Sequence, residues 1–378
     1  MARHPYNGLP DYAYWRRAVA SVPPGALDPM LEAPFKIGAR DKVATAGSCF
    51  AQHIGRYIAA AGCAHLVTEE AHPLLPEGAR IATNYGLYTA RYGNIYTARQ
   101  LVQLFERAYG RFRPVEDIWK EKPGVYVDPF RPNIQPRGFN SEREFALDRE
   151  RHFRAVRQAF ETLDVFVFTL GLTEAWRARA DGAVFPVRPG VSGGTFDPSR
   201  HEFVNFGVDE VVADLQMFIA GLRAVNRKAR IVLTVSPVPL SATAESRHVL
   251  ASTVYSKSVL RVAAETISRA HDHVAYFPSY EIVASGFAGD YFASDKRSVT
   301  EDGVAHVMSV FAKHFLSDEP ADGSSLLGLV KHAVAGRLGL RTTLDDAKAA
   351  GLQAVFKVMC DEEALDAPVG GGDASSTG

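Results

Sequence analysis

Short runs of β-branched and aromatic residues alternate with longer helical patterns along most of this chain, and few folds accommodate that order. Apolar runs that predict strands lie at 42–47, 64–70, 164–171, 229–240 and 273–280. Apolar residues with helical spacing predict helices over 50–61, 98–110, 141–161, 208–225, 246–270 and 299–316. Strands that alternate with helices form a parallel sheet covered by helices on both faces. We therefore predict an α/β fold, a three-layer doubly wound parallel sheet.

The carboxyl ends of the predicted strands are where reactive side chains are expected. In doubly wound sheets these ends meet at one edge, and ligands bind in the crevice outside it. The rule brings Ser48 to the same edge as residues 169–174, 236–241 and 279–295. These segments are far apart in the sequence, so the fold is needed to make one site of them.

The chain divides into four predicted regions. Residues 1–34 form an N-terminal extension, 35–317 the α/β domain, 318–362 a C-terminal helical extension, and 363–378 a low-complexity tail that we expect to be disordered. Inside the domain, the polar and Pro-rich stretch 111–140 is too long for an ordinary connection. We expect it to cover a face of the domain or to rim a cleft.

Charge and hydropathy exclude several classes of partner. The chain has 42 basic and 43 acidic residues, so its sequence has no basic footprint for nucleic acid. Its apolar runs fall short of the ~20 residues that cross a bilayer. The amino terminus lacks the apolar region of a secretory signal. From these features we expect a soluble, cytoplasmic protein without a membrane span.

Metal and cofactor motifs are missing from the sequence. The three cysteines, Cys49, Cys63 and Cys360, are too scattered for a disulfide framework or a zinc site. We expect Cys49 to be a small buried hydrophobe beside a turn. The glycine-rich segment RPGVSGG lacks the lysine of a phosphate-binding loop. We predict neither a metal nor a cofactor, and the sequence carries no signal for the oligomeric state.

Six short blocks follow one another in the order found in a known family. They are GSCFA (47–51), RYGNIYTARQL (91–101), TLGLTEAW (169–176), TVSPVPL (234–240), YSKSVLR (255–261) and YFPSYEI…DYFASD (276–295). Together they resemble the GSCFA family, which is similar to the SGNH or GDSL-like esterases and acyl hydrolases. The resemblance spans residues 35–317. It implies an ester hydrolase or acyltransferase whose substrate is poorly defined.

Ser48 is the nucleophile that the resemblance implies. In the SGNH pattern the first strand ends at a serine that begins the following helix, and here the block reads Gly47-Ser48-Cys49. The positive end of a helix at this point favours negative charge on the attacked oxygen. The alternative interpretation is that Ser48 caps the helix over 50–61.

The resemblance also implies an oxyanion hole. Its donors would be the N–H of Ser48, Gly93 with Asn94 as an additional donor, and a third group at the position where the SGNH pattern has asparagine. That position is occupied by Thr173, whose hydroxyl is shorter than a carboxamide. The alternative for Thr173 and Glu174 is a helix N-cap followed by an acidic first turn.

The block that should contain the catalytic base departs from the family pattern. Asp295 stands at the aspartate of the Asp-x-x-His block, but the histidine position holds Ser298. His248 is the candidate replacement, because it follows a strand end at the start of the helix 246–270; the alternative is a surface histidine. His306 is the other candidate, but it points about 150° from the apolar stripe of its helix, which favours a solvated side chain paired with Asp302. The sequence also leaves open that no histidine serves as the base.

Two further residues are predicted to bind substrate. Glu174 and Trp176 belong to the TLGLTEAW block, and Tyr85, Tyr88 and Tyr96 surround the same blocks. Aromatic rings can stack on a sugar or acyl group, although an aromatic core would use them equally well. We predict a serine-dependent ester hydrolase or O-acyltransferase that acts on a small acyl ester, with a carbohydrate-linked ester as the expected substrate. The alternative is a non-catalytic module that binds a ligand or glycan on the same fold.

Overall fold

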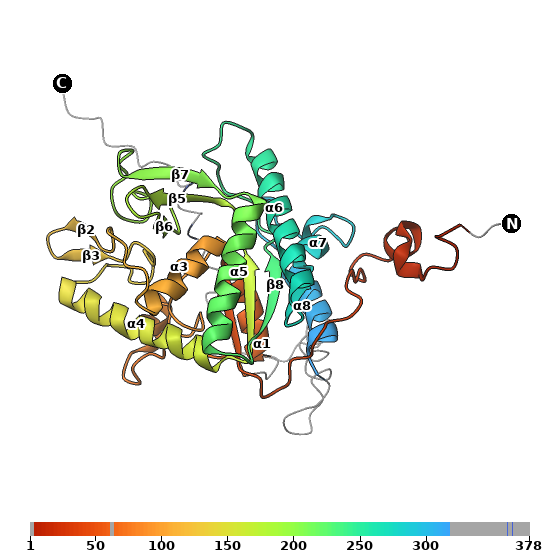
Figure 1. Cartoon of the computed structure of the whole chain (residues 1–378), viewed down its shortest axis with the longest axis horizontal. Helices are drawn as coiled ribbons and strands as arrows, with labels where there is room; N and C mark the ends of the chain where they lie inside the picture. Colours follow the sequence, from red (N-terminus) through yellow and green to blue (C-terminus); the bar gives the residue numbers. More distant parts are fainter. Residues whose placement is uncertain (1–3, 61–63, 318–360, 362–364, 366–378) are drawn as a thin grey trace, which may run out of the picture.

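The computed structural model describes residues 4–60 and 64–317, together with Asp361 and Leu365 (Figure 1). The predicted helical extension and the predicted disordered tail lie outside the described residues, apart from those two positions.

Four parallel strands form the central sheet. They are β1 (Val43–Gly47), β4 (Val165–Leu170), β8 (Arg230–Val235) and β9 (Val274–Phe277), in the spatial order β1-β4-β8-β9. Each of the four was predicted from its apolar run, and all neighbouring pairs are parallel. The predicted α/β fold with a central parallel sheet is confirmed.

The strand predicted over 64–70 was wrong, because only one bridge forms there. His65 pairs with Val43 of β1, on the edge opposite β4. The chain then leaves the sheet, and Glu69 turns inward to accept a hydrogen bond from the backbone N–H of Arg91. A buried charge needs such partners, and they draw the segment away from the sheet. Because this single bridge does not continue as a strand, β1 is an edge strand of the four-stranded sheet, and its carboxyl end lies at the edge where ligands bind in such sheets.

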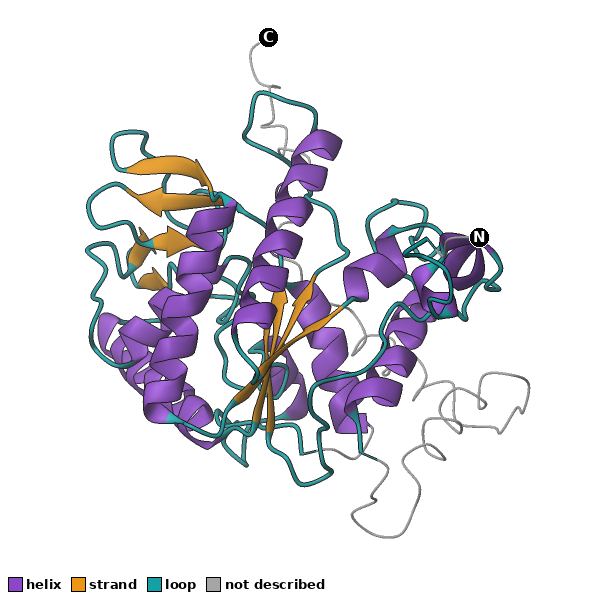
Figure 2. Ribbon diagram, turned by 45° about the vertical axis from the view of Figure 1, so that its right-hand side comes forward, coloured by secondary structure: helices purple, strands orange, loops and turns teal. Residues whose placement is uncertain are grey.

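One face of the sheet is covered by three helices. These are α1 (Cys49–Ala60), α7 (Ser279–Ala284) and α8 (Glu301–Phe315). Their apolar side chains pack against alternate strand residues, including Val165 and Val167 of β4. Figure 2 shows the sheet nearly edge-on, with helices on both of its sides.

Four other helices cover the opposite face. They are α3 (Ala98–Ala108), α4 (Glu142–Thr162), α5 (Val208–Val225) and α6 (Val249–Ala270). They pack against the other alternate residues of the strands. In β4 these are Phe166, Phe168 and Leu170, so both faces of the strand are buried, as its continuous apolar run predicted. The three-layer architecture follows from this alternation.

Two small antiparallel sheets and a short helix complete the domain (Figure 1). The strands β2 (Trp119–Lys122) and β3 (Val125–Val127) form a hairpin. The second sheet has the order β6-β5-β7, with bounds Val184–Phe185, Glu174–Ala178 and His201–Asn205 respectively, and α2 spans Glu77–Ala82. Because β5 follows β4 after three residues, the second sheet stands at the carboxyl edge of the central sheet.

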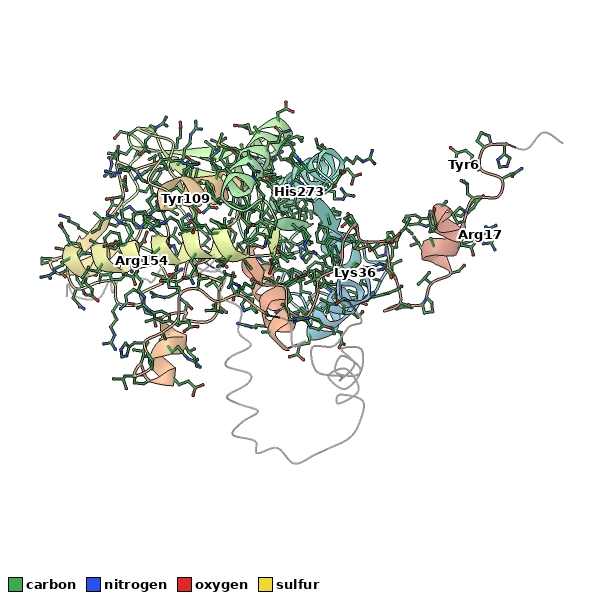
Figure 3. All side chains as sticks on the ribbon, turned by 60° about the horizontal axis from the view of Figure 1, so that its bottom comes forward. Tyr6, Arg17, Lys36, Tyr109, Arg154 and His273 are labelled. Atoms are coloured by element: carbon green, nitrogen blue, oxygen red, sulfur yellow. The ribbon has the colours of Figure 1, made fainter. Side chains whose placement is uncertain are left out.

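The Pro-rich stretch 111–140 lines a pocket, as predicted for a segment that rims a cleft. Its residues 130–134 lie beside Gly93 and Asn94. At the other end of the molecule, an N-terminal arm that carries Tyr6 and Arg17 extends away from the body (Figure 3). The arm contains the short helices η1 (Asp11–Ala13) and η2 (Arg16–Ala20). Within the described part of the chain, no helix has both the length and the apolar character needed to cross a bilayer.

Candidate active site

The junction between β1 and α1 carries Ser48. Gly47, the last residue of β1, has φ 138°, and a Cβ atom there would lie 2.3 Å from the carbonyl oxygen of Thr169. Only glycine fits so close to β4. The backbone N–H of Ser48 then donates to the same carbonyl oxygen at 3.2 Å. The sequence therefore folds into a tight turn that presents Ser48 at the amino end of α1.

The Ser48 hydroxyl is buried, and no other described residue hydrogen-bonds to it. Ser48 is 3% exposed, and its Oγ has no hydrogen-bond partner. The alternative interpretation as a side-chain helix cap is therefore wrong, because a capping hydroxyl accepts a backbone N–H. The predicted oxyanion donor at the Ser48 N–H is already bonded to Thr169. A buried hydroxyl without a partner is uncommon and marks a position where function can explain the cost.

Gly171, at the end of β4, forms the wall next to Ser48. A Cβ atom on Gly171 would lie 3.0 Å from the Cβ of Ser48 and 3.0 Å from the carbonyl oxygen of Tyr96. The Gly171 carbonyl oxygen accepts a 2.5 Å hydrogen bond from the Nζ of Lys257. Lys257 is only 1% exposed, so a buried side-chain amino group on α6 helps to hold Gly171 in place.

Gly93 and Asn94, both predicted for the oxyanion hole, lie at the end of β1. The backbone N–H of Ile95 donates to the Gly47 carbonyl oxygen at 2.8 Å, which brings the segment to the strand end. Gly93 has φ 71°, a conformation that favours glycine. Asn94 is 3% exposed, and its Oδ1 accepts hydrogen bonds from Gln52 Nε2 at 3.1 Å and the Tyr88 hydroxyl at 3.4 Å.

A carboxyl group accepts the hydrogen bond from the NH₂ group of Asn94. Asn94 Nδ2 donates to Asp361 Oδ2 at 2.9 Å, and the Tyr96 hydroxyl donates to the same oxygen at 3.3 Å. Asn133 Nδ2 donates to Asp361 Oδ1 at 2.6 Å. The reasoning from the sequence missed Asn133 and Asp361, and it noted Tyr96 only as an aromatic side chain. No motif or spacing connects these residues before the chain is folded.

A buried network of charges supports the loop that carries Asn133. Arg131, two residues earlier, pairs with Asp128 at 2.8 Å and with Asp148 of α4 at 2.8 Å. Arg91 also pairs with Asp148, at 2.9 Å. Both arginine side chains are almost completely buried, so their carboxylate partners are needed to offset the loss of hydration.

Thr173 uses its polar atoms for contacts with neighbouring elements. Its hydroxyl donates to Asn205 Oδ1 of β7 at 2.6 Å, and its backbone N–H donates to Ser256 Oγ of α6 at 3.0 Å. The alternative interpretation of Thr173 and Glu174 as a helix start was wrong, because Glu174 begins β5. Thr173, the predicted third oxyanion donor, thus links β7 of the second sheet with α6 in this structure.

Glu174 and Trp176 line one pocket of about 190 Å³. Arg188 and Leu365 also line it. Glu174 accepts a 2.6 Å hydrogen bond from the Thr243 hydroxyl, and burial raises the pKa of its carboxyl group above the ordinary value. The two residues predicted to bind substrate therefore face the same cavity.

His248 is exposed at the N-cap of α6. Its Nδ1 accepts a hydrogen bond from the Leu250 N–H at 3.1 Å, so the imidazole caps the helix. The next residue, Val249, packs against the apolar cluster of Tyr96, Leu172 and Leu240. His248 therefore adjoins the cluster that contains Tyr96, without a hydrogen bond to the Ser48 hydroxyl.

Asp295 is exposed and makes its contacts locally. Its carboxylate accepts hydrogen bonds from the Ser298 hydroxyl at 2.5 Å and from the backbone N–H groups of Arg297 and Ser298, both at 2.9 Å. The hydrogen bond from the Ser298 hydroxyl is the main cause that lowers the pKa of Asp295. Ser298 stands at the histidine position of the family block, and it donates hydrogen bonds to Asp295 where the family pattern has a histidine.

His306 is buried, and the expectation of a solvated histidine paired with Asp302 was wrong. The His306 side chain forms a 2.8 Å hydrogen bond between its Nδ1 and the Tyr291 hydroxyl. The residue is 8% exposed, and burial lowers the pKa of the imidazole. The loop before α8 places Tyr291 against the helix and buries His306. The apolar stripe of α8 alone does not predict this contact.

Among the side chains that the structure describes, no three His, Cys, Asp or Glu residues gather closely enough to hold a metal ion. Cys49 is buried at the start of α1, as expected for a small apolar residue beside a turn.

The comparison with protein families decides the membership of the chain. The model of the GSCFA family matches residues 42–311, which contain β1, the junction at Ser48 and all four strands of the central sheet. The chain belongs to the GSCFA family.

Among curated proteins, no relative of this GSCFA chain was found. Three solved structures resemble it distantly. A putative platelet activating factor from Streptococcus pneumonia has a TM-score of 0.25 at 11% identity, and the match covers 40% of this chain and 59% of that one. An acetyl esterase mutant with acetate ion has a TM-score of 0.32 at 11% identity, over 72% and 95% of the two chains. A carbohydrate esterase family 3 protein from Talaromyces cellulolyticus has a TM-score of 0.26 at 14% identity, over 58% and 89%. These similarities are too distant to bear on the function of this GSCFA protein.

Proposed function

We propose that this GSCFA protein is an ester hydrolase or O-acyltransferase that acts on a small acyl ester with Ser48 as its nucleophile. The observation that carries the proposal is the Ser48 hydroxyl itself. It is buried at the amino end of α1, directly after the carboxyl end of β1, and it makes no hydrogen bond to another described residue. A hydroxyl in this position is left available for attack on a substrate carbonyl.

The proposed reaction has two steps. In the first, Ser48 Oγ attacks the acyl carbon and its proton passes to a base, which gives that proton to the ester oxygen as the bond to the acyl carbon breaks and the alcohol leaves. In the second, water or an acceptor hydroxyl attacks the acyl-serine and releases the acyl group from Ser48. Asn94 Nδ2 and the Gly93 N–H are the proposed donors to the oxyanion, helped by the partial positive charge at the start of α1, roughly half an elementary charge. Thr173 would join them only by releasing Asn205.

His248 and Asp295 are the proposed groups for the proton. Both would have to leave present contacts, since His248 caps α6 and Asp295 bonds to Ser298. Catalytic hydrogen bonds in unliganded enzymes are often long and tighten only when substrate binds. Val249, the next residue after His248, packs against the Tyr96 cluster, so this helix start lies close to the proposed site.

The pocket of Glu174 and Trp176 is the proposed site for the alcohol part of the ester. An aromatic ring beside a buried carboxyl group suits a sugar, because the ring packs on the apolar face of the sugar while the carboxyl group binds its hydroxyls. The proposed substrate is therefore an O-acyl group on a carbohydrate.

A non-catalytic binding module is the second candidate. The observation that favours it is that no base in the described part of the chain is hydrogen-bonded to Ser48. On this reading the pocket binds an acylated ligand without cleaving it.

Covalent labelling distinguishes the two functions. A fluorophosphonate probe should modify Ser48, located by mass spectrometry, and a nitrophenyl acetate assay should lose its signal in Ser48→Ala. Ser236→Ala is the matched control, since Ser236 is also buried directly after a strand of the sheet. Modification of another serine with Ser48 untouched, or equal hydrolysis by Ser48→Ala and the unchanged chain, would contradict the proposal.

A further inference from the structure

Asp361 is enclosed by hydrogen-bond donors from two distant parts of the chain. It is 7% exposed, and its two carboxyl oxygens accept hydrogen bonds from Asn94, Tyr96 and Asn133. The backbone N–H of Asp361 also donates to the Tyr96 hydroxyl at 3.0 Å. Four hydrogen bonds thus fix a residue that is more than 260 positions away from two of its partners.

The donors around Asp361 are neutral. They are two carboxamide groups and a phenol, and the hydrogen bonds they form only partly offset the burial that raises the pKa of the Asp361 carboxyl group. A pocket with these donors suits a planar group with two oxygens and no full charge. The acyl end of an ester has this shape, because its carbon carries a carbonyl oxygen and an ether oxygen in one plane.

Two indirect links connect the site of Asp361 with the surroundings of Ser48. Gln52, four residues after Ser48 on α1, donates to the Asn94 amide that holds Asp361. The backbone N–H of Gly171 donates to the Tyr96 carbonyl oxygen at 3.0 Å, and a Cβ atom on Gly171 would lie 3.0 Å from the Cβ of Ser48. Asp361 therefore shares its surroundings with the proposed nucleophile.

Leu365 lies in the neighbouring pocket. It lines the cavity of Glu174 and Trp176, while Asp361 lines the cavity of Asn94 and Asn133. Each of these two residues thus lines one of the two cavities of the proposed site.

We propose that Asp361 is an internal ligand that occupies the acyl-binding site of this chain, so that a substrate must displace Asp361 before its acyl group reaches Ser48. This inference rests on the proposed function and adds a mode of self-inhibition to it. The Asn94, Tyr96 and Asn133 side chains form the acyl-binding site, and a short carboxylic acid or acyl ester is the class of ligand that competes with Asp361.

The test compares the full-length chain with Asp361→Ala and Asp361→Asn. The rate of fluorophosphonate labelling at Ser48 should rise at least tenfold in Asp361→Ala, because the site is then open. It should rise less in Asp361→Asn, which keeps the size of the side chain and one acceptor oxygen. Asp11→Ala is the matched control, since Asp11 is an exposed carboxylate on the N-terminal arm and should leave the rate unchanged.

A second readout does not depend on the reactivity of Ser48. Acetate at about 0.1 M and about pH 5, where part of it is the uncharged acid, should raise the unfolding temperature of Asp361→Ala by about 3 °C more than that of the unchanged chain. Chloride is the salt control, and the shift is expected because a ligand that binds only the folded state stabilises it.

The outcomes separate the two proposals. Equal labelling rates together with equal acetate shifts would overturn the role of Asp361. Absence of labelling at Ser48 in every variant, together with the larger acetate shift in Asp361→Ala, would refute the proposed nucleophile and support the acyl-binding site.

Discussion

Gln52 orients Asn94. The side-chain NH₂ of Gln52 donates to the Asn94 Oδ1 at 3.1 Å, so the Asn94 carboxamide directs its own NH₂ group toward Asp361. Both residues are at most 3% exposed, and the Tyr88 hydroxyl also donates to the same Oδ1. The direction of the proposed oxyanion donor is therefore set by a side chain on the helix that begins after Ser48.

We expect Gln52→Met to lower kcat for a small ester about tenfold, with KM changed less. The substitution keeps the length of the side chain but removes the donor, and a misdirected Asn94 loses about 1.4 kcal/mol of transition-state stabilisation. Gln158→Met on the exposed side of α4 is the control. A change confined to KM would mean that Gln52 acts on ground-state binding instead.

Asn94 and Thr173 are expected to differ sharply, although the resemblance assigned both to the oxyanion hole. Asn94→Ala should lower kcat by 100-fold or more, since loss of one such donor costs about 2.7–4 kcal/mol. Thr173→Val should lower the free energy of unfolding by about 1 kcal/mol, because its hydrogen bond to Asn205 is lost, and should leave kcat within about threefold. Steady-state kinetics and urea unfolding of both variants provide the measurements. A decrease in kcat of more than about threefold in Thr173→Val would indicate that Thr173 does donate to the oxyanion.

His248→Asn separates the capping role of His248 from its proposed role as a base. Asparagine is a good N-cap, so the stability of α6 should be retained. If the imidazole takes the proton of Ser48, kcat should fall by about 100-fold or more while the free energy of unfolding changes by less than about 0.5 kcal/mol. Unchanged turnover would remove His248 from the mechanism.

Inhibition by Asp361 should weaken as the pH rises. Burial raises the pKa of its carboxyl group in the folded chain, so the docked state holds its proton more tightly than the released state does. Docking is therefore strongest below the ordinary carboxyl pKa of about 4 and weakens as the pH increases through the raised pKa. Tyr96 donates to Asp361, and Tyr88 and Arg131 line the same pocket. Burial raises the pKa of Tyr88 well above the ordinary tyrosine value, and the pKa of Arg131 is also raised, so neither group changes its charge between about pH 5 and pH 8.

The measurement is the ratio of Ser48 labelling rates in Asp361→Ala and in the unchanged chain. The ratio cancels the pH dependence of the probe chemistry, and it should be larger near pH 5 than near pH 8, because docking weakens as the pH rises above the ordinary carboxyl pKa of about 4. A ratio that is constant with pH would show that the ionisation of Asp361 does not control its docking.

Local patterns were enough to predict the sheet and the position of Ser48. The strand at 164–171 is apolar on both faces, and only a covered parallel strand tolerates that pattern. The run at 64–70 looks similar, yet Glu69 is drawn into a buried hydrogen bond and the strand does not form. Propensity cannot anticipate such a tertiary contact.

The site was less predictable than the sheet because its parts meet only after folding. Asn94 stands in a family block, whereas Asn133 lies in a polar loop and Asp361 near the carboxyl end, and nothing in their local sequence marks them. Ser298 in place of histidine was visible in the sequence, but its contact with Asp295 was not.

The ion pairs of Arg131 hold one side of the acyl-binding site, the loop of Asn133, more firmly than the other side, Asp361, is held. Removing one partner of a buried pair costs about 3–5 kcal/mol, so the loop of Asn133 cannot move without a large loss of stability. Asp361, in contrast, is tied by hydrogen bonds to neutral groups. The loop of Asn133 therefore stays in place while Asp361 can be displaced. Substitutions at position 361 can change access to Ser48 without altering the rest of the acyl-binding site.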